Sequence, residues 1–123
     1  MIQVFVVTTL KPGMRDAFVR AFLDNVPNVL REKGCLQYGP SLDAPGIDHP
    51  AQTKLGPDTC AVLEAWESWD ALMAHVGAPH MKAFDERVMP MVAERKVYIL
   101  SPAESGAMGS PAESGAKGSP AAT

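Results

Sequence analysis

The sequence predicts an α+β fold of the ferredoxin-like, split βαβ type, in which helices cover one face of an antiparallel sheet. Two observations support this prediction. The hydrophobic period alternates between strand and helix values along residues 1–100, and the predicted elements follow the order β-α-β-β-α-α-β. Composition agrees, because 46% of the 123 residues are hydrophobic, which is enough for the core of a single domain.

The first strand and the first helix are separated by a clear turn signal. Residues 2–9 are rich in Val and Phe and predict a strand, and the Lys-Pro-Gly segment at 11–13 predicts the turn that closes it. Residues 14–33 then place apolar side chains at helical spacing. Gly34 follows the basic end of this segment, as expected where a helix stops.

The remaining elements show strand and helix patterns of the same kind. Ser68 is a suitable N-cap for a short helix that Gly77 ends, and Pro79 occupies the first position of the next helix. The long loop before them is rich in Pro and Gly, and loops of this length commonly have a function or a small hairpin of their own. The predicted elements are a strand over 35–42, the loop over 44–58, a strand over 59–66, helices over 68–76 and 79–91, and a strand over 95–100.

The predicted strands are apolar on both faces. In the first strand, Val4 and Val6 alternate with Phe5 and Val7, and the third and fourth strands show the same pattern. Helices of a split βαβ fold cover only one face, so the other face would remain as an apolar interaction patch. The sequence therefore predicts a homodimer, two-fold symmetric and packed sheet against sheet.

The composition changes abruptly after residue 100. SPAESGAMG at 101–109 is followed by SPAESGAKG at 110–118, a nine-residue repeat with little to bury. Such a segment cannot offset the entropy of ordering, so we expect a domain over 1–100 and a disordered, low-complexity tail over 101–123.

Charge and cysteine content exclude several classes of protein. The formal net charge is −3, so no basic surface is expected to bind nucleic acid or an anionic membrane. No apolar run is long enough to span a bilayer. Cys35 and Cys60 are too few for a disulfide framework, and we expect free thiols and a cytoplasmic location.

One segment concentrates the residues that are suited to chemistry. Trp66 ends a predicted strand, and His75 and His80 lie on the apolar faces of the two helices that follow. Each histidine alone is consistent with an ordinary core residue. Two imidazoles beside an indole also fit a ligand pocket, in which a histidine could accept a proton near neutral pH.

Two other groups of residues leave alternatives open. Asp43, Asp48 and His49 lie in the long loop or next to it and could hold a metal, although no supporting partner can be named for them. Glu64 alternates in phase with Trp66, so it either reaches the same pocket or forms a cross-strand or dimer ion pair. Neither group defines a motif, and we expect no metal site.

Three segments resemble the antibiotic biosynthesis monooxygenase superfamily, especially its quinol monooxygenase branch: LKPGMRDAF, VPNVLREKGCLQYGP and LEAWESWDALMAHVGAPHMKAF. The resemblance covers nearly all of residues 1–100. It implies a dimeric α+β barrel and an oxygenase that uses no flavin, haem or metal. It also implies a pocket between sheet and helices, with the family's pocket positions falling on Tyr38, Trp66, His75 and His80.

The resulting expectation is a cofactor-independent monooxygenase that oxidises a small aromatic quinol or phenol with molecular oxygen. His75 or His80 would accept the phenolic proton, Tyr38 and Trp66 would donate to the oxyanion, and Phe84 would form an apolar wall against the ring. Two alternatives remain. One is a binding protein without catalysis. The other is a haem-binding or haem-degrading relative, which is disfavoured because residues 4–9 offer no amide.

Overall fold

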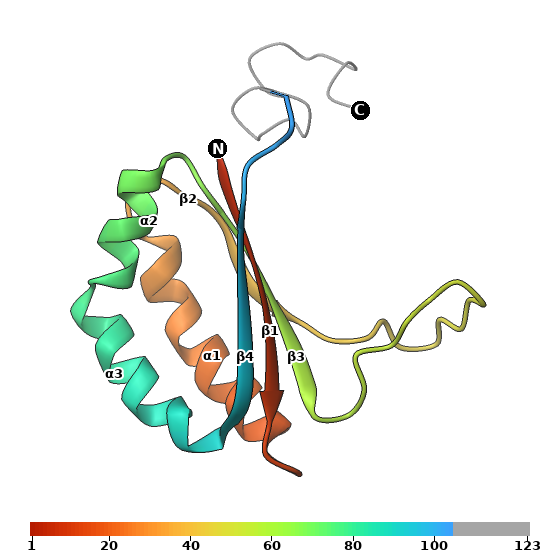
Figure 1. Ribbon diagram of the computed structural model, residues 1–123. Coiled ribbons are helices and arrows are strands. Elements are labelled where there is room, and N and C mark those ends of the chain that lie inside the picture. The colour runs from red at the N-terminus through yellow and green to blue at the C-terminus, as the bar shows by residue number, and fades with distance from the viewer. Residues whose placement is uncertain (105–123) are drawn as a thin grey trace.

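A computed structural model describes residues 1–104 and has the predicted ferredoxin-like α+β fold (Figure 1). Three helices lie on one face of a four-stranded antiparallel sheet, whose strand order is β2-β3-β1-β4. Residues 105–123, with most of the predicted tail, lie outside the described residues. The elements are β1 (Ile2–Leu10), α1 (Arg15–Leu30), β2 (Cys35–Ser41), β3 (Thr59–Trp66), α2 (Trp69–Val76), α3 (Pro79–Val88), a 3-10 turn η1 (Met89–Met91) and β4 (Val92–Leu100).

The element boundaries follow local chemistry. The Ser68 hydroxyl accepts a hydrogen bond from the Ala71 N–H at 3.1 Å and caps α2, and Pro79 begins α3, both as predicted. The predicted third helix is shorter than expected, because Pro90 has no N–H to continue it and a 3-10 turn follows Val88. The last strand begins at Val92, three residues before the predicted start at 95, since its pairing with β1 extends to Leu10.

The core lies between the helices and three of the four strands. Alternate residues of β1 face the helices and are buried, from Val4 to Leu10, and Phe18 and Phe22 of α1 pack against this layer. The fourth strand is different: Val97 and Ile99 are in register with buried β1 residues but remain about half exposed. The helices therefore leave a gap over β4.

Among residues 1–104, no helix has the length and hydropathy to cross a membrane.

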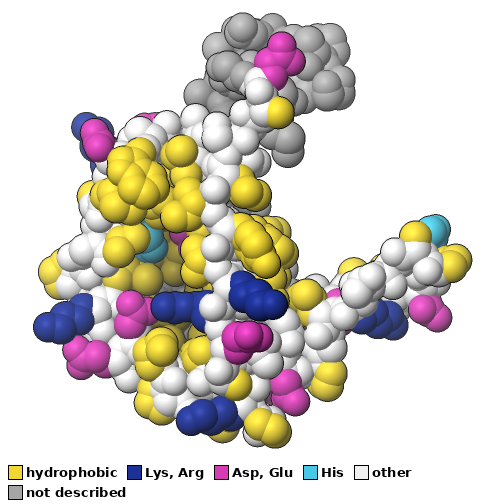
Figure 2. All heavy atoms as spheres, in the orientation of Figure 1, with side chains coloured by type: hydrophobic (Ala, Val, Ile, Leu, Met, Phe, Trp, Pro, Cys, Tyr) yellow, Lys and Arg dark blue, Asp and Glu magenta, His cyan; other side chains and the backbone are white. Residues whose placement is uncertain are grey.

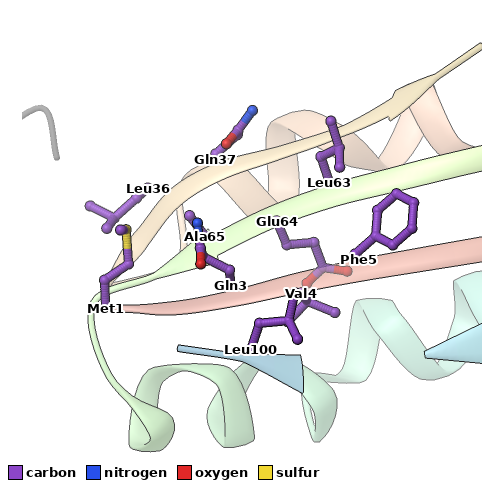
Figure 3. Close-up of a pocket in the computed structure, with 10 residues that line it drawn as sticks. All are labelled: Met1, Gln3, Val4, Phe5, Leu36, Gln37, Leu63, Glu64, Ala65 and Leu100. Carbon is purple, nitrogen blue, oxygen red and sulfur yellow. The ribbon is translucent and has the colours of Figure 1, made fainter. Parts of the chain in front are cut away.

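The opposite face of the sheet is not covered by any element among residues 1–104. Leu63, Tyr98 and Leu100 are exposed there to 38%, 45% and 49%, and the Phe5 ring stacks on Tyr98 with centroids 6.0 Å apart. A broad hollow adjoins this face, with a volume of about 650 Å³. Figure 3 shows the side chains that line it. The lining of the hollow is mostly apolar and contains no histidine, and Glu64 is its one ionisable side chain.

The connection between β2 and β3 projects from the sheet as an extended arm (Figure 1). Asp43 at its base accepts hydrogen bonds from the N–H groups of Leu55 and Gly56 at 2.8 and 3.0 Å, which lower the pKa of its carboxyl group. His49 accepts from a nearby backbone N–H, and Asp48 lies 3.9 Å from the Lys54 ammonium. The predicted metal alternative is not supported: residues 1–104 contain no group of three or more potential metal ligands.

Gly34 allows the turn after α1 to dock against α2. Its φ is +86°, and a Cβ built there would lie 2.6 Å from the Ala71 Cβ. We expect Gly34→Ala to lower the free energy of unfolding by about 2 to 4 kcal/mol, because the contact must open and an L residue disfavours this φ. Urea unfolding measures the change. Gly46→Ala is the control, since Gly46 has φ +74° with no atom within 4 Å of the added Cβ; equal losses in the two variants would show that the contact is unimportant.

Candidate functional site

The gap between β4 and the helices α2 and α3 contains a cavity of about 200 Å³. Figure 2 shows a histidine inside a mostly hydrophobic hollow between the helices and the last strand. Apolar residues of β1, β4 and α2 form most of its lining. The volume is below the roughly 300–1,000 Å³ of sites for drug-sized ligands, so it suits a small molecule. The ionisable side chains of the lining are Glu64, His75, Asp85 and Arg95.

His75 occupies the inner wall of this cavity. It lies in the last turn of α2, one turn after the buried Leu72, and only 4% of the residue is exposed. Its ring lies 4.6 Å from the Trp66 ring and 5.4 Å from the Tyr38 ring, between centroids. Of the predicted group of Trp66, His75 and His80, the rings of Trp66 and His75 lie together, and Tyr38 packs against His75 beside them. Val76, the next residue, is exposed at the rim of the cavity.

Glu32 joins the two predicted histidines and was not found from the sequence. One oxygen of its carboxylate, Oε2, lies 2.9 Å from His75 Nδ1 and 3.0 Å from His80 Nε2. Glu32 lies in the turn after α1, and the backbone carbonyl of Gly34 in this turn accepts from the Glu67 N–H at 2.8 Å. In sequence, Glu32 looks like an ordinary charged residue at a helix end, so no local signal marks it.

Trp66 supports the site from behind rather than facing a ligand. Its side chain is fully buried, and its indole N–H donates to Glu64 Oε1 at 3.0 Å instead of projecting into the cavity. Glu64 itself lines the cavity, as one of its two sequence-based alternatives expects, and it also lines the hollow on the open face of the sheet. Burial raises the pKa of the Glu64 carboxyl group, while the Trp66 hydrogen bond and the nearby His75 act in the opposite direction.

The other predicted site residues lie outside the cavity lining. His80 and Phe84 line a shallow hollow between α1 and α3, and the Phe84 ring packs edge-on against Phe22 at 5.5 Å. The Tyr38 ring stacks on the Phe22 ring, with centroids 4.9 Å apart. Burial raises the pKa of the Tyr38 hydroxyl, so it remains a protonated phenol. Of the five predicted residues, His75 alone lines the cavity.

The two cysteines have no features of reactive thiolates. Both are free thiols. Burial, followed by the neighbouring Glu32 and Glu64 carboxyl groups, raises the pKa of Cys35 to about 11. The buried Cys60 also has a raised pKa, caused mainly by desolvation. Both thiols therefore stay protonated at neutral pH, and the acid–base chemistry of this region belongs to the carboxyl and imidazole groups.

The raised pKa of Glu64 predicts a pH-dependent effect of Glu64→Gln on stability. The folded protein holds the Glu64 proton more tightly than the unfolded chain, whose carboxyl group has a pKa near 4.5. The wild type therefore loses stability as the pH rises above this value, whereas Gln does not titrate and can still accept from Trp66. We expect Glu64→Gln to stabilise the protein more at about pH 8 than at about pH 4, as measured by urea unfolding. A pH-independent difference would contradict the stated effect of burial.

The sheet, the one-sided helices and the cavity under them define a ferredoxin-like α+β protein with a small, histidine-bearing pocket. Residues 1–87 match the antibiotic biosynthesis monooxygenase family, and the chain belongs to this family. It is 38% identical over 105 residues to the probable quinol monooxygenase YgiN of Escherichia coli K12, a match that covers 83% of this chain and 98% of YgiN.

Solved structures show the same fold at lower sequence identity. A structure from Nitrosomonas europaea superposes with a TM-score of 0.71 at 22% identity, covering 85% of this chain and all of the other. PA3566 from Pseudomonas aeruginosa has a TM-score of 0.69 at 21% identity, with 84% and 94% of the two chains covered. These similarities confirm the predicted fold and do not by themselves define an activity.

Proposed function

We propose that the protein is a monooxygenase that oxidises a small quinol or related phenol with molecular oxygen and without flavin, haem or metal. The observation that carries the proposal is a buried histidine in the wall of a small, largely apolar cavity. The 38% identity to a probable quinol monooxygenase supports the same reaction class. A flat aromatic ring suits such a cavity, and the histidine can serve as its base.

The chemistry begins with a proton transfer. Molecular oxygen reacts slowly with closed-shell molecules, so without a cofactor the substrate must supply the electrons. A histidine, either His75 or His80, takes a phenolic proton, and the anion gives one electron to oxygen. The resulting radical and superoxide combine to form a carbon–oxygen bond, and the imidazolium returns its proton to the outer peroxide oxygen.

The second half of the reaction breaks the oxygen–oxygen bond. The outer oxygen leaves as water with the proton from the substrate carbon, and the inner oxygen remains as a new carbonyl. Hydroquinone and oxygen thus give hydroxyquinone and water, with all four electrons drawn from the substrate. Tyr38, which stays protonated, lies outside the cavity lining and packs edge-on against the His75 ring, so its proposed role is to hold that ring in place. Trp66 donates a hydrogen bond to Glu64 and packs against the His75 ring, so its proposed role is to hold these two side chains in position. Phe84 packs edge-on against Phe22, and its proposed role is to support the apolar core beside the site.

The proposed assembly is a two-fold homodimer packed through the open face of the sheet. Exposed Leu63, Tyr98 and Leu100 on this face support it, together with the apolar hollow that they adjoin (Figure 3). Packing of two sheets would remove this surface from water and form the dimeric α+β barrel.

The proposed location of the protein is the cytoplasm, because its free thiols fit a reducing compartment.

Oxygen uptake tests the proposed reaction. Purified protein is mixed with a panel of benzo- and naphthohydroquinones in an oxygen electrode, and a protein-free solution gives the rate of spontaneous oxidation. We expect uptake above that rate and one ¹⁸O atom per product from ¹⁸O₂. Dialysis against EDTA should leave the rate unchanged. Tight quinol binding without uptake would favour a binding protein, and a Soret band on haem titration would favour a haem-binding protein.

A further inference from the structure

We infer that Glu32 is the positioning residue that makes His75, and not His80, the base of this site. The inference deepens the proposed function and rests on it for the identity of the reaction. It depends on three observations: one carboxylate oxygen contacts both histidines, only one histidine lines the cavity, and the contacts use different ring nitrogens.

The contact with Glu32 determines which nitrogen of His75 is free. A carboxylate can only accept, so the 2.9 Å contact requires a proton on His75 Nδ1. The neutral ring then carries its lone pair on Nε2, and His75 lines the cavity in which a phenol would bind. When Nε2 takes the phenolic proton, the positive ring faces Glu32 through Nδ1. This is the arrangement by which a carboxylate orients a catalytic imidazole in hydrolase triads.

His80 completes the arrangement from the opposite side. It meets the same Glu32 oxygen through Nε2 at 3.0 Å, and it lines the outer hollow between α1 and α3. Its Nε2 must also donate, so its lone pair is on Nδ1, which is buried and has no hydrogen-bond partner among residues 1–104. That lone pair lies outside the cavity lining, so His80 holds the carboxylate in place and does not receive the substrate proton.

The groups around His75 are consistent with a ring that becomes positive during the reaction. Glu32 approaches from the turn after α1, Glu64 from β3 and His80 from α3. The Trp66 ring lies 4.6 Å away, within the range at which an aromatic face attracts a cation. Tyr38 of β2 lies edge-on at 5.4 Å. The other charged side chains of the cavity lining are Asp85 of α3 and Arg95 of β4.

Histidine NMR tests the positioning without relying on activity. In ¹⁵N-histidine-labelled protein, at a pH at which the ring is neutral, we expect the His75 proton on Nδ1. Glu32→Leu removes the acceptor, so the neutral His75 ring should become protonated on Nε2. Glu32→Gln, whose side chain has nearly the shape of the wild-type Glu, is the second variant. Lys33→Leu, an exposed neighbour in the same turn, is the matched control. A wild-type His75 protonated on Nε2, or a spectrum unchanged in both Glu32 variants, would overturn the inference.

Steady-state kinetics provide the second measurement. Because Glu32 does not line the cavity, its replacement should lower kcat at least about tenfold and leave the KM for the quinol within about twofold. His80→Asn should lower kcat less than about fivefold, and a loss as large as that in His75→Asn would refute the assignment of the base. If the wild type oxidises no quinol, the proposed function fails, and the NMR experiment still decides whether Glu32 positions His75.

Discussion

Replacing His75 by Asn is expected to lower kcat for quinol oxidation by at least about 100-fold, which is the lower part of the range for losing a general base. The physical reason is the place of His75 in the cavity wall, with Nδ1 held by Glu32 and Nε2 left to accept a proton. Asn can still donate a hydrogen bond to Glu32, so the local packing should survive. Initial rates of oxygen uptake, corrected for spontaneous oxidation, measure the effect.

His49→Asn is the matched control for this experiment. His49 is an exposed histidine on the arm between β2 and β3, and its ring contacts only a local backbone N–H among the described residues. The control variant should keep the wild-type rate. A His75→Asn protein that is folded, binds the quinol and retains more than about a third of the wild-type kcat would exclude His75 as the base.

Replacing Leu63 by Glu is expected to convert the proposed dimer to monomers and to raise its dissociation constant at least about 100-fold. Leu63 lies in β3 on the open face of the sheet, in register with Phe5 of β1, and is 38% exposed. Sheet-to-sheet packing would bury the new carboxylate without a partner, and the two-fold axis would bring a second copy near it. Sedimentation velocity over a range of protein concentrations measures the change.

Leu23→Glu separates this effect from a general loss of apolar surface. Leu23 is 52% exposed but lies on α1, on the helical side of the molecule. The sheet-to-sheet arrangement predicts that this variant remains a dimer. A Leu63→Glu protein that still dimerises, or a Leu23→Glu protein that does not, would place the interface elsewhere.

Much of the fold could be predicted because it depends on local periodicity. The strand over 59–66 and the cap at Ser68 were predicted at their observed positions. The boundary at Val92 could not be, since only pairing with β1 extends β4 that far. The meeting of Trp66 and His75 was also predictable, because they lie on consecutive elements joined by a short turn.

The composition of the cavity could not be predicted in the same way. Phe84 is expected as an apolar wall against the substrate ring, but it packs against Phe22 in the core. Whether an apolar residue of α3 lies in the core or in the cavity depends on where the neighbouring strand lies, which periodicity does not show. The exposed Val97 and Ile99 show the reason: the helices stop short of β4, so the cavity forms over the sheet edge and not beneath the centre of the helical layer.

The amino-acid sequence by itself determined the order of the elements, the two-sided apolar strands and the presence of two inward-directed histidines, since these depend on neighbours a few residues apart. The tertiary structure alone decided that Glu32 lies between those histidines and that only His75 lines the cavity. Glu32 and His75 are 43 residues apart. Their contact depends on the turn at Gly34 docking against Ala71, a packing event that no local pattern records.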